Sequence, residues 1–396
     1  MVTLSRGTLW LMAFACGASA ANIYYNQPLL GNFAEQFQAT AVQVGWIAFA
    51  AQAGYGLGLL FFLPLGDRLE RRRLVLWIVQ ACALLLAATA FVPSLALLTW
   101  MHLAVGLTSM SAQILIPLGV ELSPPAARGH TVGVLMAGLL GGILLARTVS
   151  GFVGDHFGWR YMYGLAAILM TVLSFLLRAG LPHTKAAEPQ PYYKLMLSLW
   201  DVFKSQPRLW PASLISGLTF GSFTAFWTTL SFLMIAQFHR GASAAGAFGI
   251  IGLVGALAAP LAGKLSDRMG PNVTVTIALV ASTIAFALMW AWVSIASLII
   301  GVLLMDIGVQ SVQVAEQAKV ISLLPSARSR LNTIYMVTRF VGGALGSMTA
   351  ASAWSVARWP GVCATALAFM LASLVIHVAA RFAEKKNLPL VVTSTA

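Results

Sequence analysis

Long apolar stretches recur along the whole chain, and short polar segments separate them. Each stretch has about 18 to 25 residues, enough to cross a bilayer as a helix. They are too long and too continuous for the strands of a membrane barrel. The pattern therefore predicts an all-α polytopic membrane protein. Twelve spans are predicted, at 8–31, 42–65, 74–92, 97–121, 130–153, 160–180, 209–236, 244–263, 273–291, 294–322, 331–354 and 358–381.

Polar landmarks of the first half return in the second half at an offset of 200 residues. The matched sets are Asp67-Arg68 with Asp267-Arg268, Gln113 with Gln313, Pro125 and Arg128 with Pro325 and Arg328, and Gly142 with Gly342. A repeat in the same order with an even number of spans implies two parallel, pseudo-symmetric six-helix bundles. We expect one bundle over 1–181 and the other over 209–396. The polar linker 182–208 contains PYYKLMLSLWDVFK, which could form an amphipathic helix on the membrane surface.

Composition and charge fit this picture. The chain is 59% hydrophobic and 9% charged, against about 25% charged residues in soluble domains. With the N-terminus in the cytoplasm, 18 of the 24 Lys and Arg residues fall on the cytoplasmic side, which predicts cytoplasmic termini. The net charge of +13 is then explained by anionic lipid headgroups and calls for no nucleic acid.

The polar residues inside the spans are few and patterned. In DIGVQSVQVAEQ (306–317), Asp306, Gln310, Gln313 and Gln317 share one helical face. Asp306 and Glu316 are the only acids well inside the hydrocarbon, and such acids are functional candidates by default. Depth along the helices, at about 1.5 Å per residue, matches Glu316 with Arg339 and Asp306 with Arg147. Glu316 and Arg339 would then form either a functional pair or a purely structural ion pair. Asp306 and Arg147 would meet across the two bundles on the outer side, unless the Arg147 side chain points at lipid headgroups or at Asp155.

A loop motif carries a resemblance to a known family. LPLGDRLERRR (63–73) and GKLSDRMGPN (263–272) follow the second and eighth spans, and both are similar to the signature G-x-x-x-D-R-x-G-R-R of the major facilitator superfamily. Leu63 and Glu70 replace the two glycines in the first copy, and the second copy lacks the trailing basic pair. NIYYNQPLL (22–30) and GDHFGWRYMYG (154–164) resemble the arabinose-efflux or drug–proton antiporter branch.

The resemblance implies a gate at the cytoplasmic side. In that family the signature Asp caps a neighbouring helix across the bundle interface and pairs with basic residues and an acid at the end of span four. A cluster of charges that only sets the topology is the alternative. The implied gate residues are Asp67, Arg68, Arg71, Arg72, Glu121, Arg128, Asp267, Arg268 and Arg328.

The resemblance also implies a central cavity lined by the first, fourth, seventh and tenth spans. Helix–helix hydrogen bonding is the alternative for the glutamines. The implied lining residues are Asn22, Tyr25, Asn26, Ser109, Gln113, Thr224, Trp227, Gln310, Gln313, Gln317, Arg147 and Arg339.

Two positions depart from the family pattern. His102 takes the place of the arginine that often begins R-x-x-x-G in span four. An imidazole can gain or lose a proton near neutral pH, so His102 joins Asp306 and Glu316 as a candidate for proton coupling; a histidine at the membrane interface is the alternative. Ala146-Arg147 takes the place of the Gly-Pro that antiporters often carry in span five.

These features predict a secondary active transporter in a bacterial cytoplasmic membrane that works by alternating access. We expect proton-coupled efflux of a small organic solute. Proton-coupled uptake of an organic anion is the runner-up, supported by Arg147 and Arg339 and by the missing Gly-Pro. A non-transporting sensor is the rival from another class. We expect a monomer that is not an enzyme, with no metal and no cofactor, because neither a P-loop nor a nucleophile–base cluster is present and Cys16, Cys82 and Cys363 lack metal-ligand spacing.

Overall fold

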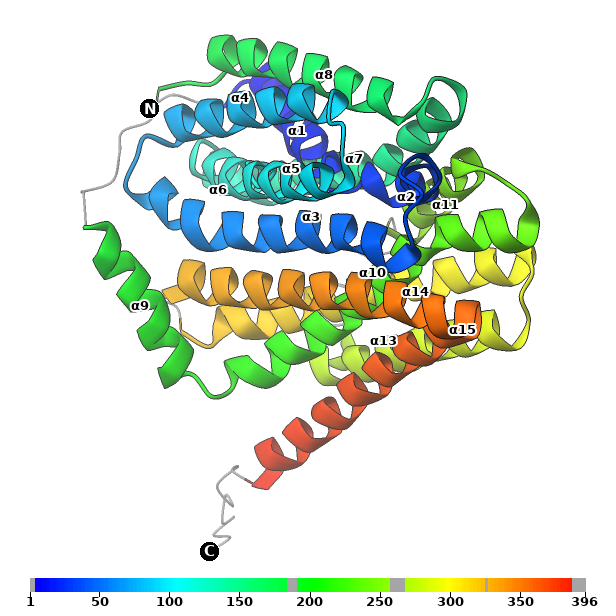
Figure 1. Ribbon diagram of the computed structural model, residues 1–396. Coiled ribbons are helices and arrows are strands. Elements are labelled where there is room, and N and C mark those ends of the chain that lie inside the picture. Colours follow the sequence, from blue (N-terminus) through cyan, green and yellow to red (C-terminus); the bar gives the residue numbers. More distant parts are fainter. Residues whose placement is uncertain (1–3, 184–190, 257–267, 325–326, 387–396) are drawn as a thin grey trace, which may run out of the picture.

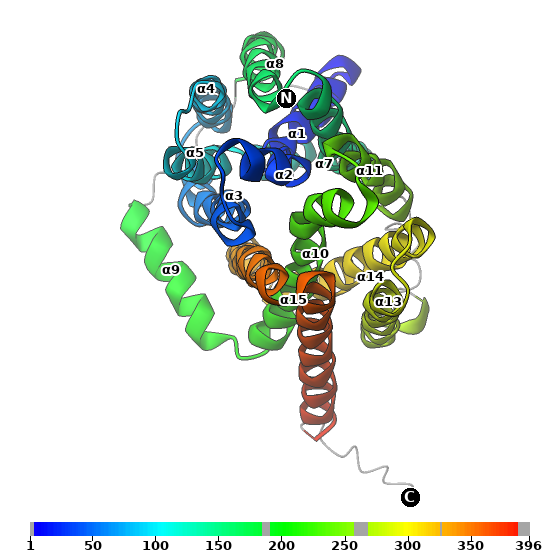
Figure 2. The ribbon, with the colours of Figure 1, turned by 45° about the vertical axis from the view of Figure 1, so that its right-hand side comes forward.

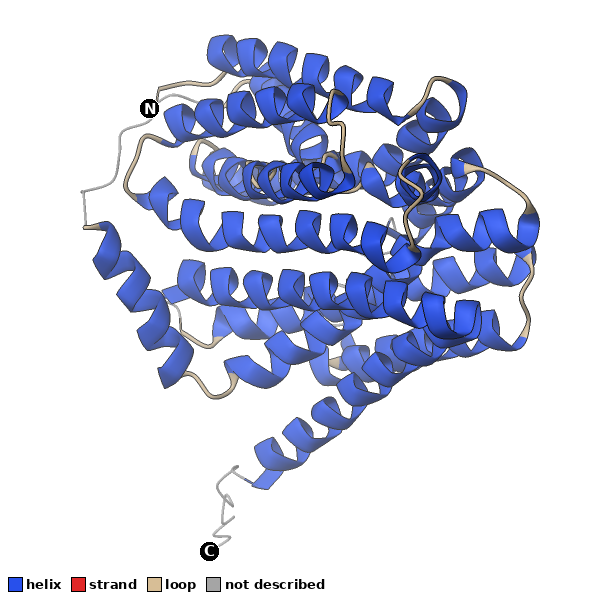
Figure 3. Ribbon diagram, in the orientation of Figure 1, coloured by secondary structure: helices blue, strands red, loops and turns tan. Residues whose placement is uncertain are grey.

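A computed structural model describes residues 4–183, 191–256, 268–324 and 327–386, and within these ranges every regular element is a helix (Figure 3). Nine of the described helical stretches are long and apolar enough to cross a membrane. The all-helical architecture predicted from the apolar pattern is therefore confirmed, whereas the count of twelve spans stays a prediction.

The first half of the chain forms eight α-helices and two short 3₁₀ helices. They are α1 (Arg6–Ala21), α2 (Asn26–Gln36), α3 (Ala41–Phe62), η1 (Pro64–Asp67), α4 (Arg71–Ala90), α5 (Leu95–Thr108), α6 (Ala112–Glu121), η2 (Pro125–Ala127), α7 (Arg128–His156) and α8 (Trp159–Gly180). The described part of the linker holds α9 (Tyr192–Ser205), and the described second half holds α10 (Leu209–Phe238), α11 (Ala242–Ala256), α13 (Pro271–Ala291), α14 (Ile295–Ser322) and α15 (Arg328–Lys386).

Four predicted spans differ from the observed helices. Residues 22–25 form a turn between α1 and α2, and residues 109–111 separate α5 from α6, so two expected continuous helices are each broken near the middle. The opposite happens in α15, which covers two expected spans and changes direction at Ala357 and Arg358, whose backbone angles are not helical. Pro360 follows this bend, where its missing N–H and its ring are compatible with a helix start.

The helices of the two halves run roughly side by side (Figures 1 and 2). Most helices of the first half fill the upper part of Figure 1, and most of the second half fill the lower part. The halves meet where α3 packs on α15 and where α7 packs on α11. We call the left-hand end in Figure 1, where α9 lies, the basic end. Arg71 and Arg72 begin α4, Arg178 lies in the last turn of α8, and Arg72 donates to the Arg178 carbonyl. The right-hand end, with α2 and the start of α11, is the opposite end.

The internal repeat reappears as a pair of equivalent helix contacts. A methyl group added at Gly142 of α7 would lie 2.3 Å from the Cα of Gly17 in α1. A methyl group at Gly342 of α15 would lie 2.1 Å from the carbonyl oxygen of Gly217 in α10. Gly17 and Gly217 are 200 residues apart, as are Gly142 and Gly342. The two halves therefore use the same close contact between helix backbones. Small residues allow such approaches in membrane helices, where packing rather than water exclusion holds helices together.

The opposite end is closed by a contact between α7 and α11. A methyl group at Gly151 of α7 would lie 2.4 Å from the carbonyl oxygen of Ala242, so the two helices approach closely. The carboxylate of Asp155 accepts hydrogen bonds from the backbone N–H groups of Ala242 (2.8 Å) and Ser243 (2.6 Å). Asp155 thus caps the N-terminus of a helix in the other half, where its charge also interacts favourably with the helix dipole. The capped helix start and the close packing hold the two halves together at this end.

We expect Asp155→Ala to release the start of α11. The N–H groups of Ala242 and Ser243 would lose their acceptor, a change that costs about 0.5–2 kcal/mol at a helix N-terminus. Hydrogen–deuterium exchange of these two amides should become faster, while Asp201→Ala, which removes an exposed acid of α9, should leave them unchanged. Unaltered exchange in Asp155→Ala would show that the cap does not stabilise this end.

Candidate functional site

A cavity of about 460 Å³ lies between the two halves and is lined by both of them. It reaches from Leu63, Gly66 and Arg71 at the basic end to Tyr24 and Phe223 deep in the bundle. Its size is in the range of pockets that hold small organic molecules. The cavity is therefore the candidate binding site, accessible from the basic end and closed towards the opposite end.

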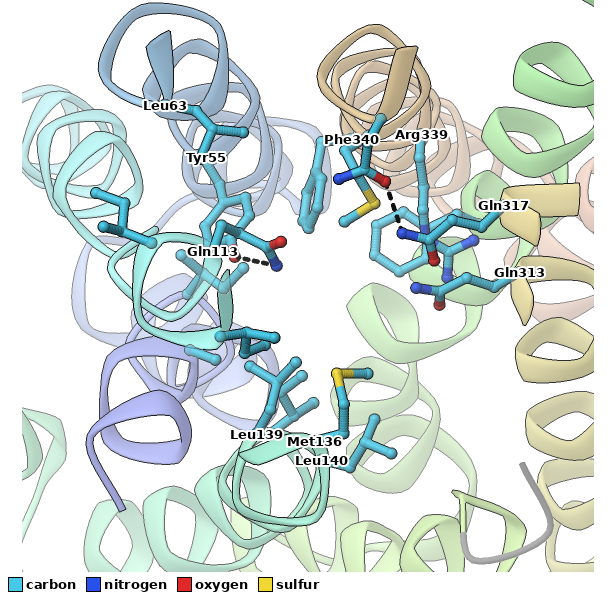
Figure 4. Close-up of a pocket in the computed structure, with 18 of the residues that line it drawn as sticks. Tyr55, Leu63, Gln113, Met136, Leu139, Leu140, Gln313, Gln317, Arg339 and Phe340 are labelled. Atoms are coloured by element: carbon cyan, nitrogen blue, oxygen red, sulfur yellow. Dashed lines mark hydrogen bonds between the residues drawn. The ribbon is translucent and has the colours of Figure 1, made fainter. Parts of the chain in front are cut away.

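Two opposing walls of the cavity carry amides (Figure 4). Gln113 of α6 donates weakly to the hydroxyl of Tyr55 (3.5 Å), and Gln317 of α14 donates to Asn332 of α15 (2.7 Å). Gln310 and Gln313 of α14 also line the cavity. These four glutamines thus line the cavity, and their role in binding a substrate stays a prediction. An amide can both donate and accept hydrogen bonds, so this wall can bind polar groups of either kind.

Arg339 is a charged residue on the same wall. It lies on α15, and in Figure 4 its side chain lies beside those of Gln313 and Gln317. One terminal nitrogen donates to the Ser216 hydroxyl (3.1 Å), and the guanidinium carbon lies 4.2 Å from the ring centre of Phe220. The predicted ion pair between Glu316 and Arg339 is wrong, because Glu316 pairs with Lys319 three residues further along α14 (2.8 Å).

Several residues predicted to line the cavity lie elsewhere. The amide of Asn22 donates to the Cys82 sulfur (3.3 Å), Asn26 donates to the Ile23 carbonyl (3.0 Å), and Tyr25 lies on a separate groove between α1, α7 and α8. Ser109 and Thr224 use their hydroxyls on backbone carbonyls. For the first span the physical reason is the turn at residues 22–25, which rotates the chain so that Tyr24 faces the cavity.

Arg147 lies beyond the closed end of the cavity, inside an aromatic box. Its guanidinium carbon is 4.0 Å from the ring centre of Trp227, 4.7 Å from that of Tyr24 and 5.5 Å from that of Phe223. Its Nε donates to the Gln27 side chain (2.7 Å), but the two terminal nitrogens have no hydrogen-bond partner. Arg147 is fully buried, so it does not extend to headgroups, and Asp155 is occupied with α11. Tyr24 and Phe223 separate Arg147 from the cavity that it was predicted to line.

Asp306 is buried close to Arg147 without forming an ion pair with it. Both carboxylate oxygens lack a hydrogen-bond partner. One carboxylate oxygen lies close to Gly252 of α11, because a methyl group added at Gly252 would be 2.7 Å from it. The same methyl group would also contact the side chains of Leu144 and Trp227. The guanidinium is stacked on aromatic rings and bonded to Gln27, so no hydrogen bond joins the two groups in this conformation. That Asp306 and Arg147 approach each other to close this end stays a prediction.

His102 is enclosed within the first half, away from the cavity. Its Nδ1 donates to the Leu98 carbonyl (2.8 Å), since a carbonyl oxygen only accepts, and Nε2 bonds to the Tyr163 hydroxyl (2.7 Å). Phe33 contacts the ring edge-on, and the residue is 1% exposed. Both ring nitrogens are thus occupied in a buried packing site. His102 therefore does not line the cavity, and its predicted role in proton coupling stays a prediction.

The basic end holds part of the predicted gate. Arg71 forms an ion pair with Glu121 and donates to the Gly66 carbonyl (3.3 Å), and Arg72 bonds to the Arg178 carbonyl and to His183. Arg68, Arg128, Arg268 and Arg328 are exposed. The Asp67 side chain and the whole of Asp267 lie outside the described residues, so their latch remains a prediction.

Aromatic lining residues were missed by the sequence reasoning. Tyr55 of α3 and Phe340 of α15 stack at 4.3 Å between ring centres, and Phe220 lies 5.3 Å from Phe340. The sequence offered little signal for them, because an aromatic residue in an apolar helix looks the same whether it faces lipid, a neighbouring helix or a cavity.

Comparisons with known proteins give one family. The family model of the Major Facilitator Superfamily matches residues 9–347 and 247–394. A putative uncharacterized transporter of Escherichia coli, YgaY, is 39% identical over 375 residues, which cover 94% of this chain and 95% of that protein. A probable transporter of Streptomyces coelicolor is 35% identical, over 93% of this chain and 86% of its own length.

Solved structures show the same fold. The nucleoside transporter NupG superposes with a TM-score of 0.76 at 16% identity, covering 95% of this chain and 99% of NupG. A bacterial homologue of the human lysosomal transporter Spinster, solved inward-facing and occupied, gives a TM-score of 0.71 at 14% identity, with 96% of each chain covered. At these identities the similarity concerns the fold alone.

We expect Tyr163→Phe to lower the thermal stability of the protein. Nε2 of His102 would remain buried without its partner, which costs about 1–3 kcal/mol. The matched change Tyr161→Phe removes a hydroxyl from a tyrosine that is 70% exposed and should leave the unfolding midpoint in detergent unchanged. Equal midpoints for the two variants would contradict a structural role for the His102–Tyr163 bond.

Proposed function

The chain belongs to the Major Facilitator Superfamily, and from this premise we propose that it is a proton-coupled secondary active transporter of a small organic solute. The relatives and the structural neighbour named above are described as transporters. The observation that carries the coupling proposal is the buried Asp306, whose carboxylate lies unpartnered just beyond the closed end of the cavity.

Alternating access is supported by the difference between the two ends of the molecule. The cavity reaches the basic end, where amides and Arg71 line it. The opposite end is held shut by the α7–α11 contact and the Asp155 cap. If the basic end faces the cytoplasm of a bacterium, as the distribution of Lys and Arg favours, this conformation is inward-open. Transport then requires the α7–α11 contact to break while the basic end closes.

Asp306 is placed to couple a proton to that change. An ionised carboxylate without hydrogen-bond donors raises the free energy of the state that buries it. Opening of the α7–α11 contact beside Gly252 would admit water to this carboxylate, so its hydration depends on conformation. A group whose environment differs between two states binds a proton with different affinity in each, and this difference is what couples protonation to the transition.

The proposed direction is efflux. Proton-coupled uptake of an organic anion is the second candidate, and the observation that favours it is Arg339 on the cavity wall. Proteoliposomes with an imposed pH gradient of either sign distinguish the two directions. A sensor that does not transport would show no gradient-dependent flux of any solute.

We expect Asp306→Asn to abolish gradient-driven accumulation while exchange of solute without a gradient continues. Flux in proteoliposomes, screened over radiolabelled anionic, neutral and cationic organic solutes, would fall at least about tenfold under a pH gradient. Glu316→Gln is the matched control, because it neutralises the other intramembrane acid, which is already paired with Lys319. Full accumulation by Asp306→Asn together with its loss in Glu316→Gln would assign the coupling to Glu316 instead.

We expect Asp67→Asn to weaken the conformation in which the cytoplasmic end is closed. The reason is the family signature at residues 63–73 and the Arg71–Glu121 ion pair beside it. A single cysteine at Asn332, on the cavity wall, would report access from the basic end in a background without Cys16, Cys82 and Cys363. Labelling should be faster in Asp67→Asn than in the control Asp201→Asn. Identical labelling rates would remove the latch.

A further inference from the structure

The cavity wall carries an uncompensated positive charge. Arg339 is 4% exposed, and among the described residues no carboxylate lies within ion-pair distance of it. Arg71, the other described cation of the lining, is paired with Glu121 at the mouth. No Asp or Glu occurs among the described lining residues. The described cavity therefore has a net positive charge when it is empty.

This charge is costly, and no described residue forms an ion pair that neutralises it. An arginine in the interior of a membrane helix is unfavourable by several kcal/mol unless it finds partners or water. Glu316 lies on the neighbouring helix α14, yet its ion pair is with Lys319. Ser216 accepts one hydrogen bond, and Phe220 offers the face of its ring. The described contacts orient the guanidinium by one neutral bond and one ring, without supplying a counter-ion.

The rest of the wall favours an organic ligand with a flat apolar part. Tyr55, Phe220 and Phe340 present aromatic rings that contact one another in sequence, with Phe340 in the middle. Figure 4 shows Tyr55 and Gln113 on one side of the space and Arg339, Gln313 and Gln317 on the other. A small inorganic anion bound at Arg339 would make no contact with most of these rings. The charge of Arg339 and the three rings therefore favour an aromatic ligand with one anionic group.

We propose that Arg339 binds the carboxylate of an aromatic organic anion in this cavity, while Tyr55, Phe220 and Phe340 contact its ring. The planar guanidinium can form two parallel hydrogen bonds to a carboxylate, which makes arginine the suited residue for this group. The amides of Gln313 and Gln317 are placed to bind further polar substituents. The inference rests on the proposed function, since it takes the cavity as the substrate site.

The experiment compares three probes that share a ring and differ in charge: 2-naphthoate, 2-naphthamide and 2-naphthylmethylammonium. Binding to the purified full-length protein in detergent is measured by titration calorimetry, with no membrane and no gradient. The wild-type protein should bind naphthoate at least about tenfold more tightly than naphthamide, which corresponds to about 1.4 kcal/mol. The ammonium probe should bind most weakly, because Arg339 repels it.

Variants then assign the preference to one residue. Arg339→Gln should reduce the affinity for naphthoate at least about tenfold and leave the affinity for naphthamide within about twofold of the wild-type value. Arg339→Lys keeps the charge without the planar fork and should be intermediate. Arg381→Gln removes the same charge from the far end of α15 and should change nothing. If Arg339→Gln does not fold, the affinities of the three probes for the wild type and for Arg339→Lys still show whether Arg339 sets the preference for an anion.

The proposal is overturned if naphthamide or the ammonium probe binds as tightly as naphthoate, if naphthoate does not bind at millimolar concentration, or if a folded Arg339→Gln retains the wild-type preference. These results are independent of coupling. Naphthoate binding without gradient-driven flux would contradict the proposed function alone, whereas gradient-driven flux of a cationic or neutral solute together with no preference for naphthoate would contradict this inference alone.

Discussion

Burying charge in a membrane interior is the constraint on which the arrangement of this protein depends. Three charged residues, Asp306, Arg147 and Arg339, lie deep in the bundle without an ion-pair partner among the described residues. Many other buried polar groups have partners, as in the His102–Tyr163 bond and the hydroxyls bonded to carbonyls one turn earlier. The unpaired charges therefore concentrate where the two halves meet, which is the region that a transport cycle has to rearrange.

Aromatic side chains make this arrangement possible. Arg147 is surrounded by the rings of Tyr24, Phe223 and Trp227. Arg339 lies against the ring of Phe220. Each guanidinium thus contacts aromatic rings in place of a counter-ion from the described residues. Contacts of this kind are worth about 0.5–2 kcal/mol, less than a complete neutralisation. The same rings form the closed end of the cavity, since Tyr24 and Phe223 line it on one side and contact Arg147 on the other. A movement of these rings would change the cavity and the surroundings of Arg147 together.

The sequence predicted the fold more fully than it predicted the site. Long apolar stretches predict helices in a bilayer, and the structure is all-helical in its described part. Gly142 and Gly342, which the 200-residue repeat matched, make equivalent close contacts. The glutamine stripe of α14 also faces the cavity as its periodicity predicted. Periodicity failed where the helix was assumed to be continuous: the turn at residues 22–25 brings Tyr24 to the cavity in place of Tyr25. Counting depth along helices failed for Glu316 and Arg339, because equal depth does not fix the direction of a side chain, and Lys319 lay nearer.

We propose that the two ends of the bundle open alternately and that protonation of Asp306 shifts the balance between them. Spin labels on cysteines at residues 128 and 328 would report the distance across the basic end, and labels at residues 157 and 240 the distance across the opposite end, in a background without native cysteines. Double electron–electron resonance in lipid nanodiscs at two pH values measures both. Because ionised Asp306 is disfavoured where it is buried and gains water when the α7–α11 contact opens, protonation favours the closed contact. We therefore expect acidification to shorten the 157–240 distance and to lengthen the 128–328 distance, and Asp306→Asn to have the same effect at neutral pH. Distances that do not depend on pH at either end, or that change in the same sense at both, would contradict it.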